Sequence, residues 1–182
     1  MVGLLGAQAG RTLVTQGEVR IAQTRSACFS AILGPCIATL IWDPVAQIGG
    51  INHLLTPNSA PREPAGLGHD VNLMELLING VLAAGGDRRR LEAKMFGGAR
   101  MIDGLGSTGA TNTTFVETFL SDESIPCTAR STGGTYARRI RAWPAKGRVQ
   151  QLRVRDGDNN GGLGSRGDLR DRALRLSGVE LL

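Results

Sequence analysis

The chain has 182 residues, of which 41% are apolar and 20% are charged, and this size and composition are typical of one globular domain with its own hydrophobic core. It contains no run of eighteen or more apolar residues, which excludes a membrane-spanning helix, so we expect no insertion into a membrane. Three cysteines and two histidines are too few for a disulfide framework or a zinc site, so we expect a cytoplasmic protein without a metal or cofactor.

Basic residues gather late in the chain. Between residues 130 and 155 there are eight basic side chains and no acidic one, within a chain of net charge +5. Such a segment attracts acidic partners. Aromatic residues make up only 4% of the chain, which leaves little surface for stacking the bases of a single strand. An acidic protein surface explains the charge equally well, and we expect no nucleic acid as a partner.

The first third of the chain reads as mostly β-structure. Short apolar runs rich in β-branched residues, separated by turn or polar residues, predict strands at residues 14–19, 27–33, 37–42 and 51–56. The third run could instead begin a helix, with Gly34 as N-cap and Pro35 in the first turn. The β-branched side chains of Ile37, Thr39 and Ile41 favour the strand.

The middle and late segments predict two helices and four further strands. Residues 58–68 read as a proline-rich loop. Asp70 is expected to cap a helix over residues 71–84 that ends at Gly85-Gly86, and Asn112 to cap a second helix over residues 113–121. The further strands are predicted at residues 91–96, 125–130, 137–143 and 148–154, the last two joined as a hairpin. Gly97-Gly98 reads as a tight turn, in preference to a phosphate cradle.

Three segments are predicted along the chain. Residues 1–13 read as a loose N-terminal arm, residues 14–155 as the folded domain, and residues 156–182 as a flexible C-terminal tail. Residues 156–168 are almost wholly Gly, Asp, Asn, Arg and Ser, and therefore bury too little apolar surface to offset the entropy of ordering. The last residues regain apolar character, and we expect them to form a short helix or to dock through Val179, Leu181 and Leu182.

Cys36 is the strongest candidate for a functional residue. It follows the turn Leu33-Gly34-Pro35, lies six residues after Ser30, and precedes His53 by seventeen residues. A thiol, an imidazole and a hydroxyl are the parts of a cysteine hydrolase, in which a base activates the nucleophile and a third group orients the base. The other two cysteines, Cys28 and Cys127, read as small buried hydrophobes, and the second histidine, His69, reads as a loop residue.

Several short blocks follow one another along the chain in an order that is typical of one protein family. The blocks are Gly17-Glu18, Leu33-Gly34-Pro35-Cys36, Asp43-Pro44, Ile48-Gly49-Gly50-Ile51-Asn52-His53, Ala93-Lys94-Met95-Phe96-Gly97-Gly98-Ala99, Gly109, Asn112, Gly133-Gly134, Arg138-Arg139 and Gly147-Arg148-Val149. From residue 14 to residue 154 the chain resembles the CheD family, the chemoreceptor glutamine deamidases of bacterial chemotaxis. The fold that this resemblance implies is α+β: a single domain of the cysteine-hydrolase type, with stacked mixed β-sheets flanked by helices.

The resemblance also implies an activity and a set of partners. The activity is hydrolysis of selected glutamine side chains on the cytoplasmic helices of methyl-accepting chemotaxis receptors, with release of ammonia through a cysteine thioester. Members also act on receptor methyl esters, and some bind a phosphatase of the pathway. By position, Cys36 is similar to the family nucleophile, His53 to the base, and Ser30 to the hydroxyl that orients the base.

Four positions depart from the family pattern. The family usually has serine where Pro35 stands, threonine at Ser30, arginine at Thr111 and an acidic residue at Ser131. Ser30 retains a hydroxyl, whereas Pro35 removes both a side chain and a backbone N–H beside the nucleophile. The alternative reading is therefore a weakly active or non-catalytic adaptor that binds a chemotaxis phosphatase or receptor.

Overall fold

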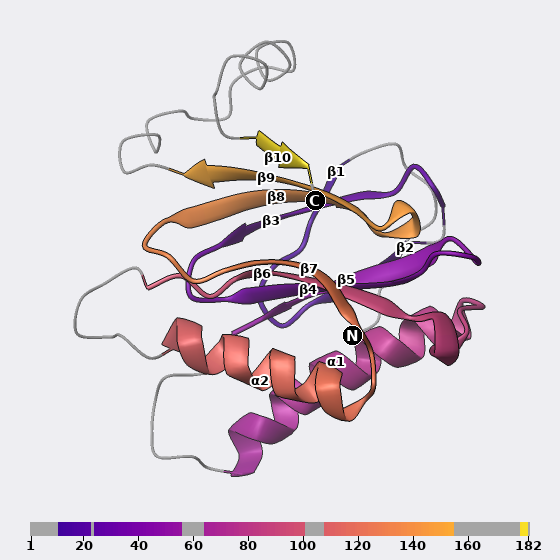
Figure 1. The fold of residues 1–182 in the computed structure, drawn as a ribbon, viewed down its shortest axis with the longest axis horizontal. Helices are drawn as coiled ribbons and strands as arrows, with labels where there is room; N and C mark the ends of the chain where they lie inside the picture. The colour runs from indigo at the N-terminus through magenta and orange to yellow at the C-terminus, as the bar shows by residue number, and fades with distance from the viewer. Residues whose placement is uncertain (1–10, 23, 56–63, 101–107, 155–178, 182) are drawn as a thin grey trace.

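The computed structural model describes residues 11–22, 24–55, 64–100, 108–154 and 179–181 as two stacked β-sheets with two helices (Figure 1). The first sheet has the order β1-β3-β8-β9-β10, with β1 at Arg11–Leu13, β3 at Cys28–Leu33, β8 at Ala137–Trp143, β9 at Arg148–Val154 and β10 at Val179–Leu181. The second has the order β2-β5-β4-β6-β7, with β2 at Val19–Ala22, β5 at Ile48–Leu54, β4 at Ile37–Asp43, β6 at Glu92–Gly97 and β7 at Cys127–Thr132.

Both sheets are mixed. In the first sheet β1 runs parallel to β3, and in the second β6 runs parallel to β7, while the remaining neighbours are antiparallel. The helices α1, Pro64–Ala83, and α2, Thr108–Asp122, both cover the outer face of the second sheet (Figure 1). Two 3₁₀ turns, Arg88–Arg90 and Pro144–Lys146, complete the described elements. The predicted α+β class with stacked mixed sheets is confirmed, and the helices lie on one side only.

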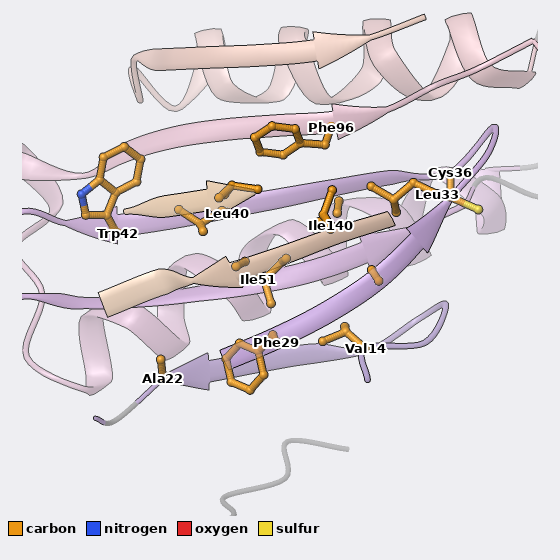
Figure 2. Close-up of a cluster of buried hydrophobic side chains, with 14 of the residues drawn as sticks. Val14, Ala22, Phe29, Leu33, Cys36, Leu40, Trp42, Ile51, Phe96 and Ile140 are labelled. Atoms are coloured by element: carbon orange, nitrogen blue, oxygen red, sulfur yellow. The ribbon is translucent and has the colours of Figure 1, made fainter. Parts of the chain in front are cut away.

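The central strand β4 explains the layered core. All seven of its residues are buried, because one face of the strand packs on the first sheet and the other on the helices. Leu40 and Trp42 join the cluster between the sheets, together with Phe29 and Ile140 (Figure 2). Ile37 and Ile41, on the opposite face, join the cluster under the helices. The predicted strand over residues 37–42 is therefore confirmed, and the helical alternative is wrong.

Most of the other predicted elements exist, with shifted boundaries. The hairpin of β8 and β9 is confirmed, and so is the helix stop at Gly85, whose φ of 108° requires glycine. The strand predicted at residues 14–19 is wrong, since β2 begins at Val19 and the preceding residues form a turn. The later strands predicted at residues 91–96 and 125–130 correspond to β6 and β7.

The two predicted helix caps are also wrong. Helix α1 begins at Pro64, and α2 begins at Thr108, so Asp70 and Asn112 lie inside helices and are buried. Proline is well tolerated in a first helical turn, so Pro64 can begin α1. Of the predicted loop at residues 58–68, residues 64–68 are helical and the rest lies outside the described residues.

The two ends of the chain contribute strands to the first sheet. The three residues of β1 fall within the predicted arm, and they pair with β3, so the sheet begins before the predicted boundary. Val179–Leu181 pair with β9 as β10, where the sequence predicted docking or a short helix. The remainder of the predicted arm and tail lies outside the described residues. Within the described ranges, neither helix is long and apolar enough to cross a membrane.

Candidate active site

Strands β4 and β5 bring Cys36 and His53 together. Cys36 directly precedes β4, and His53 pairs with Ala38 of β4 across the antiparallel ladder. Side chains alternate along a strand, so His53 shares with Ile51 the face that packs on the first sheet. Both functional side chains are buried, with 6% of Cys36 and 5% of His53 exposed. Figure 2 shows Cys36 at one end of the inter-sheet cluster, beside Leu33.

Each of these two side chains favours the charged form of the other. Burial opposes ionisation of the Cys36 thiol, but its interactions with His53 and Gln16 outweigh burial and lower its pKa below the ordinary value. Burial likewise opposes protonation of His53, but Cys36 and the Val14 carbonyl outweigh it and raise the pKa of the imidazole. Both shifts are in the direction of a thiolate next to an imidazolium.

The contact between the two groups is looser than a standard hydrogen bond. The Nε2 atom of His53 is buried and has no hydrogen-bond partner of standard geometry among the described residues. Each group nevertheless affects the other, since His53 contributes to the lowered pKa of Cys36 and Cys36 to the raised pKa of His53. Catalytic hydrogen bonds are often long until a substrate is bound, so this geometry suits a nucleophile and its base.

A turn at residues 14–18, here called the site turn, holds the imidazole in place. The Nδ1 atom of His53 lies 2.9 Å from the carbonyl oxygen of Val14, which can only accept, so Nδ1 carries the proton and Nε2 is left to face the thiol. The Gly17 N–H donates to the His53 carbonyl at 2.8 Å, and the His53 N–H donates to the Glu18 carbonyl at 3.0 Å. His53 is therefore fixed by both its ring and its backbone.

The site turn also reaches the sulfur. Gln16 is exposed, and its Nε2 atom donates to Cys36 Sγ at 3.1 Å. Sequence reasoning missed both Gln16 and Val14. The only signal was the block Gly17-Glu18, and Gly17 does adopt a φ of 77°, which shapes the turn.

The structure does not bring the Ser30 hydroxyl to the imidazole. Phe29, Ala31 and Leu33 of β3 point into the inter-sheet core, so Ser30 between them points to the opposite face of the first sheet. Among the described residues, no hydrogen bond joins this hydroxyl to His53. The orienting contact predicted for Ser30 is made by the Val14 carbonyl, and the Ser30 carbonyl accepts a hydrogen bond from the Val14 N–H at 2.8 Å.

The turn that carries Cys36 is held at three successive carbonyls. The donors are the Ala99 N–H to Gly34, the Asn112 side chain to Pro35 and the Gly98 N–H to Cys36, each at 2.8 Å. Asn112 thus uses its buried amide for a tertiary contact in place of the predicted cap. Residues from the end of β6 and from α2 therefore fix the position of the sulfur.

The tight turn predicted at Gly97-Gly98 is not formed, because Gly97 is the last residue of β6 and Gly98 follows it without a turn. Gly97 has a φ of 116°, and a Cβ atom there would lie 2.0 Å from the Cys36 carbonyl oxygen, so only glycine fits. The buried Arg138 supports the end of β6 by donating to the Gly97 carbonyl at 3.3 Å and to the Gly133 carbonyl at 2.7 Å. Its Nε also donates to the Ser131 hydroxyl at 3.4 Å, at one of the positions that depart from the family pattern.

A cavity of about 400 Å³ opens on the far side of Gly98. Its lining includes Arg100, Thr113, Thr132 and Gly133. Neither Cys36 nor His53 lines it, so it is not the reaction cavity. No group of three or more histidine, cysteine or acidic side chains in the described part of the chain is arranged to hold a metal ion.

The remaining predicted residues lie away from the site. None of the three cysteines forms a disulfide, but Cys28 is only half-buried and Cys127 is exposed, so their predicted burial is wrong. Cys127 begins β7, an edge strand, which accounts for its exposure. His69 is exposed on α1 and not in a loop.

Comparisons with known proteins identify the family of this chain. A family model described as CheD chemotactic sensory transduction matches residues 60–153. Three relatives carry the name "Probable chemoreceptor glutamine deamidase CheD". One from Caulobacter sp. strain K31 is 49% identical over 143 residues, which is 78% of this chain and 76% of the relative. One from Cereibacter sphaeroides is 47% identical, covering 80% and 73%, and one from Caulobacter vibrioides is 46% identical, covering 81% and 80%.

Among solved structures, the Neisseria meningitidis protein NMB0706 matches 69% of this chain and 64% of its own, with a TM-score of 0.43 and 9% identity. The assignment of the family rests on the sequence matches, which cover more than three quarters of the chain at close to half identity. This chain belongs to the CheD family.

Proposed function

We propose that the protein hydrolyses glutamine side chains of methyl-accepting chemotaxis receptors to glutamate and ammonia, with Cys36 as nucleophile and His53 as acid and base. Family membership supports the substrate, because the relatives at 46–49% identity are named chemoreceptor glutamine deamidases. The observation that carries the chemistry is the burial of Cys36 and His53 at one site, where the Val14 carbonyl lies 2.9 Å from His53 Nδ1 and leaves Nε2 for the thiol; the lowered pKa of Cys36 and the raised pKa of His53 agree with it. A thiolate with a neighbouring imidazolium suits the cleavage of an amide, which needs both a strong nucleophile and a proton for its leaving group.

The first half of the proposed reaction forms a thioester. The Cys36 thiolate attacks the carboxamide carbon, a C–S bond forms, and the carbonyl π electrons move onto oxygen. As this tetrahedral intermediate collapses, the C–N bond breaks and His53 transfers its Nε2 proton to the departing nitrogen. Ammonia leaves, the imidazole is neutral, and the glutamyl group is bonded to sulfur.

The second half returns the site to its starting state. Neutral His53 accepts a proton from water as the water oxygen attacks the thioester carbon. The C–S bond then breaks, which regenerates the thiolate beside the imidazolium and releases the glutamate side chain. The hydrogen bond from Nδ1 to the Val14 carbonyl supports both halves, because it keeps Nε2 directed towards the sulfur while the ring gains and loses its proton.

The proposal places the protein in the cytoplasm, since the glutamines concerned lie on the cytoplasmic helices of the receptors. A phosphatase of the same pathway is included as a second partner, as the family resemblance implies. Exposed basic side chains on β7, β8 and β9, namely Arg130, Arg139 and Arg148, support an encounter with an acidic helical surface.

The test is to incubate the protein with a cytoplasmic receptor fragment and to follow each receptor glutamine by mass spectrometry. We expect the mass gain of an amide-to-acid conversion with the wild type and with Cys127→Ala, a control that removes an exposed cysteine. Cys36→Ala is expected to give none. Equal conversion by Cys36→Ala would remove the proposal, and a stable complex with unchanged glutamines would favour the adaptor.

A further inference from the structure

Gln16 contacts the reacting sulfur itself. Its side-chain Nε2 lies 3.1 Å from Cys36 Sγ, within hydrogen-bond distance. We propose that Gln16 is a catalytic residue whose amide donates first to the Cys36 thiolate and then to the oxyanion of the tetrahedral intermediate. This inference rests on the proposed function, because it concerns the same nucleophile and the same reaction.

The chemistry of a side-chain amide fits this role. A thiolate can only accept hydrogen bonds, and the Nε2 group of glutamine offers two N–H donors. Gln16 contributes to the lowered pKa of Cys36, which is the effect expected of a donor on the charged form. The atom of the Gln16 amide that contacts the sulfur is the nitrogen Nε2. The side chain is therefore placed as a hydrogen-bond donor and not as a substrate of the thiol.

The site turn, which carries Gln16, is also hydrogen-bonded to the backbone of His53. The flanking Gly17 N–H donates to the His53 carbonyl, and the Glu18 carbonyl accepts from the His53 N–H. The turn is closed by the Thr15 N–H, which donates to the Glu18 carboxylate at 2.8 Å. Because the same short turn holds the imidazole through Val14 and the sulfur through Gln16, both contacts are fixed before any substrate arrives, as electrostatic stabilisation requires.

The residue beside the nucleophile increases the need for such a donor. Oxyanions of this kind are stabilised by backbone N–H groups and by the side chains of asparagine or glutamine. Pro35, immediately before Cys36, has no N–H to offer. The oxyanion forms on the carbon that is bonded to sulfur, so a donor that already contacts the sulfur lies next to it. The second N–H of Gln16 can then turn to the oxyanion with a small movement.

A competing reading follows from the exposure of Gln16, which would let the side chain act only as a cover over the buried sulfur. The two readings predict opposite results. A donor favours ionisation of the thiol and speeds turnover. Its loss therefore raises the pKa of the thiol and slows turnover. A cover hinders access, so its loss makes Cys36 react faster with alkylating agents and with substrate.

The first experiment measures the rate of iodoacetamide labelling at Cys36 against pH, by peptide mass spectrometry on the full chain. We expect Gln16→Met, which keeps the length but has no donor, to move the pH midpoint of labelling upward. Gln16→Glu should move it further, because a carboxylate repels the thiolate. Gln150→Met, a change of the same kind on β9, should match the wild type, and labelling of exposed Cys127 in the same samples serves as the internal reference.

The second experiment measures deamidation of the receptor fragment. Gln16→Met is expected to lower kcat about 100-fold or more with little change in KM, because the donor acts on the transition state. An unchanged labelling midpoint, or faster labelling, in Gln16→Met would overturn the inference. Labelling requires no receptor, so failure of the proposed function would appear as absent deamidation by the wild type and is distinguishable from failure of this inference.

Discussion

Two buried side chains, Cys36 and His53, shift each other's pKa in opposite directions. Burial alone disfavours a charge on either group, and the neighbours of each group outweigh burial, so the pKa of Cys36 is lowered and that of His53 is raised. Two groups that interact in this way titrate as a pair, and the loss of one must return the other to the behaviour that burial dictates. The thiol therefore reports directly on the presence of the imidazole.

We predict that His53→Gln raises the pKa of Cys36, because the imidazole no longer offsets the cost of burying a thiolate. The pH midpoint for alkylation of Cys36 should move upward, and deamidation at neutral pH should fall by about 100-fold or more, as expected when a general acid and base is removed.

His69→Gln is the matched control, since His69 is exposed on α1 and is the other histidine of the chain. It should leave both the midpoint and the activity unchanged. If His53→Gln also left the Cys36 midpoint unchanged, the pairing of thiolate and imidazolium would be refuted.

The candidate site could be predicted from the sequence only where side chains carry a signal. Cys36 and His53 stand out by residue type, by spacing and by the flanking blocks. The group that orients the imidazole is a backbone carbonyl, at Val14, and a carbonyl has no sequence signature. Ser30 was the natural candidate for that role, but the alternation of side chains along β3 turns it away from the ring.

At the scale of elements, the end of β6 determines where Cys36 lies. Gly97 and Gly98 bring this part of the chain against the Cys36 carbonyl so closely that no side chain fits at Gly97. Gly97→Ala should therefore displace the turn before β4, lower stability by more than about 2 kcal/mol and abolish most deamidation, because of both the clash and the positive φ. Urea unfolding and the receptor assay measure the two effects.

Gly133→Ala separates the clash from the conformational strain. Gly133 also has a positive φ, 74°, but a Cβ atom there would meet nothing within 4 Å. This control should cost about 1 kcal/mol and keep most of the activity. Similar losses in the two variants would show that the close approach of Gly97 to Cys36 has no functional importance.

Much of the element order could be predicted, because strands such as β4 and the core of α1 have a clear apolar pattern. The boundaries of the helices could not, for reasons that particular residues show. Asp70 and Asn112 have the residue types of caps, but their side chains are buried inside helices, and the Asn112 amide binds the Pro35 carbonyl. This role of the side chain depends on a contact between residues far apart in the sequence, and local helix propensity cannot predict such a contact.

At the scale of the whole molecule, Asp43 joins the end of the central strand β4 to the segment that follows α1. Its carboxylate is fully buried and binds the guanidinium of Arg90, with the nearest atoms 2.7 Å apart. It also accepts backbone N–H donors from Val45, Ala46 and Asp87. The hydrogen bonds from Arg90 hold the pKa of Asp43 far below its ordinary value.

A depressed pKa in the folded state makes stability depend on pH in one direction. The contribution of Asp43 is fully present above the pKa of an unfolded aspartate, about 3.9, and is lost as the pH falls towards the pKa in the folded protein. Asp43→Asn should therefore lower the free energy of unfolding by about 2 kcal/mol at neutral pH and flatten its decline in acid. The loss is moderated because 38% of the Arg90 side chain is exposed, so water can solvate the cation that remains.

Urea unfolding of Asp43→Asn and the wild type at neutral pH and at intervals below pH 4 tests this prediction. Glu117→Gln is the control, because it breaks an ion pair with Arg130 in which both side chains are well exposed. Such a surface pair should contribute less than about 1 kcal/mol and leave the acid dependence of the wild type in place. A parallel loss of stability in Asp43→Asn and the wild type as the pH falls would contradict this prediction. It would mean that groups other than Asp43 control acid unfolding.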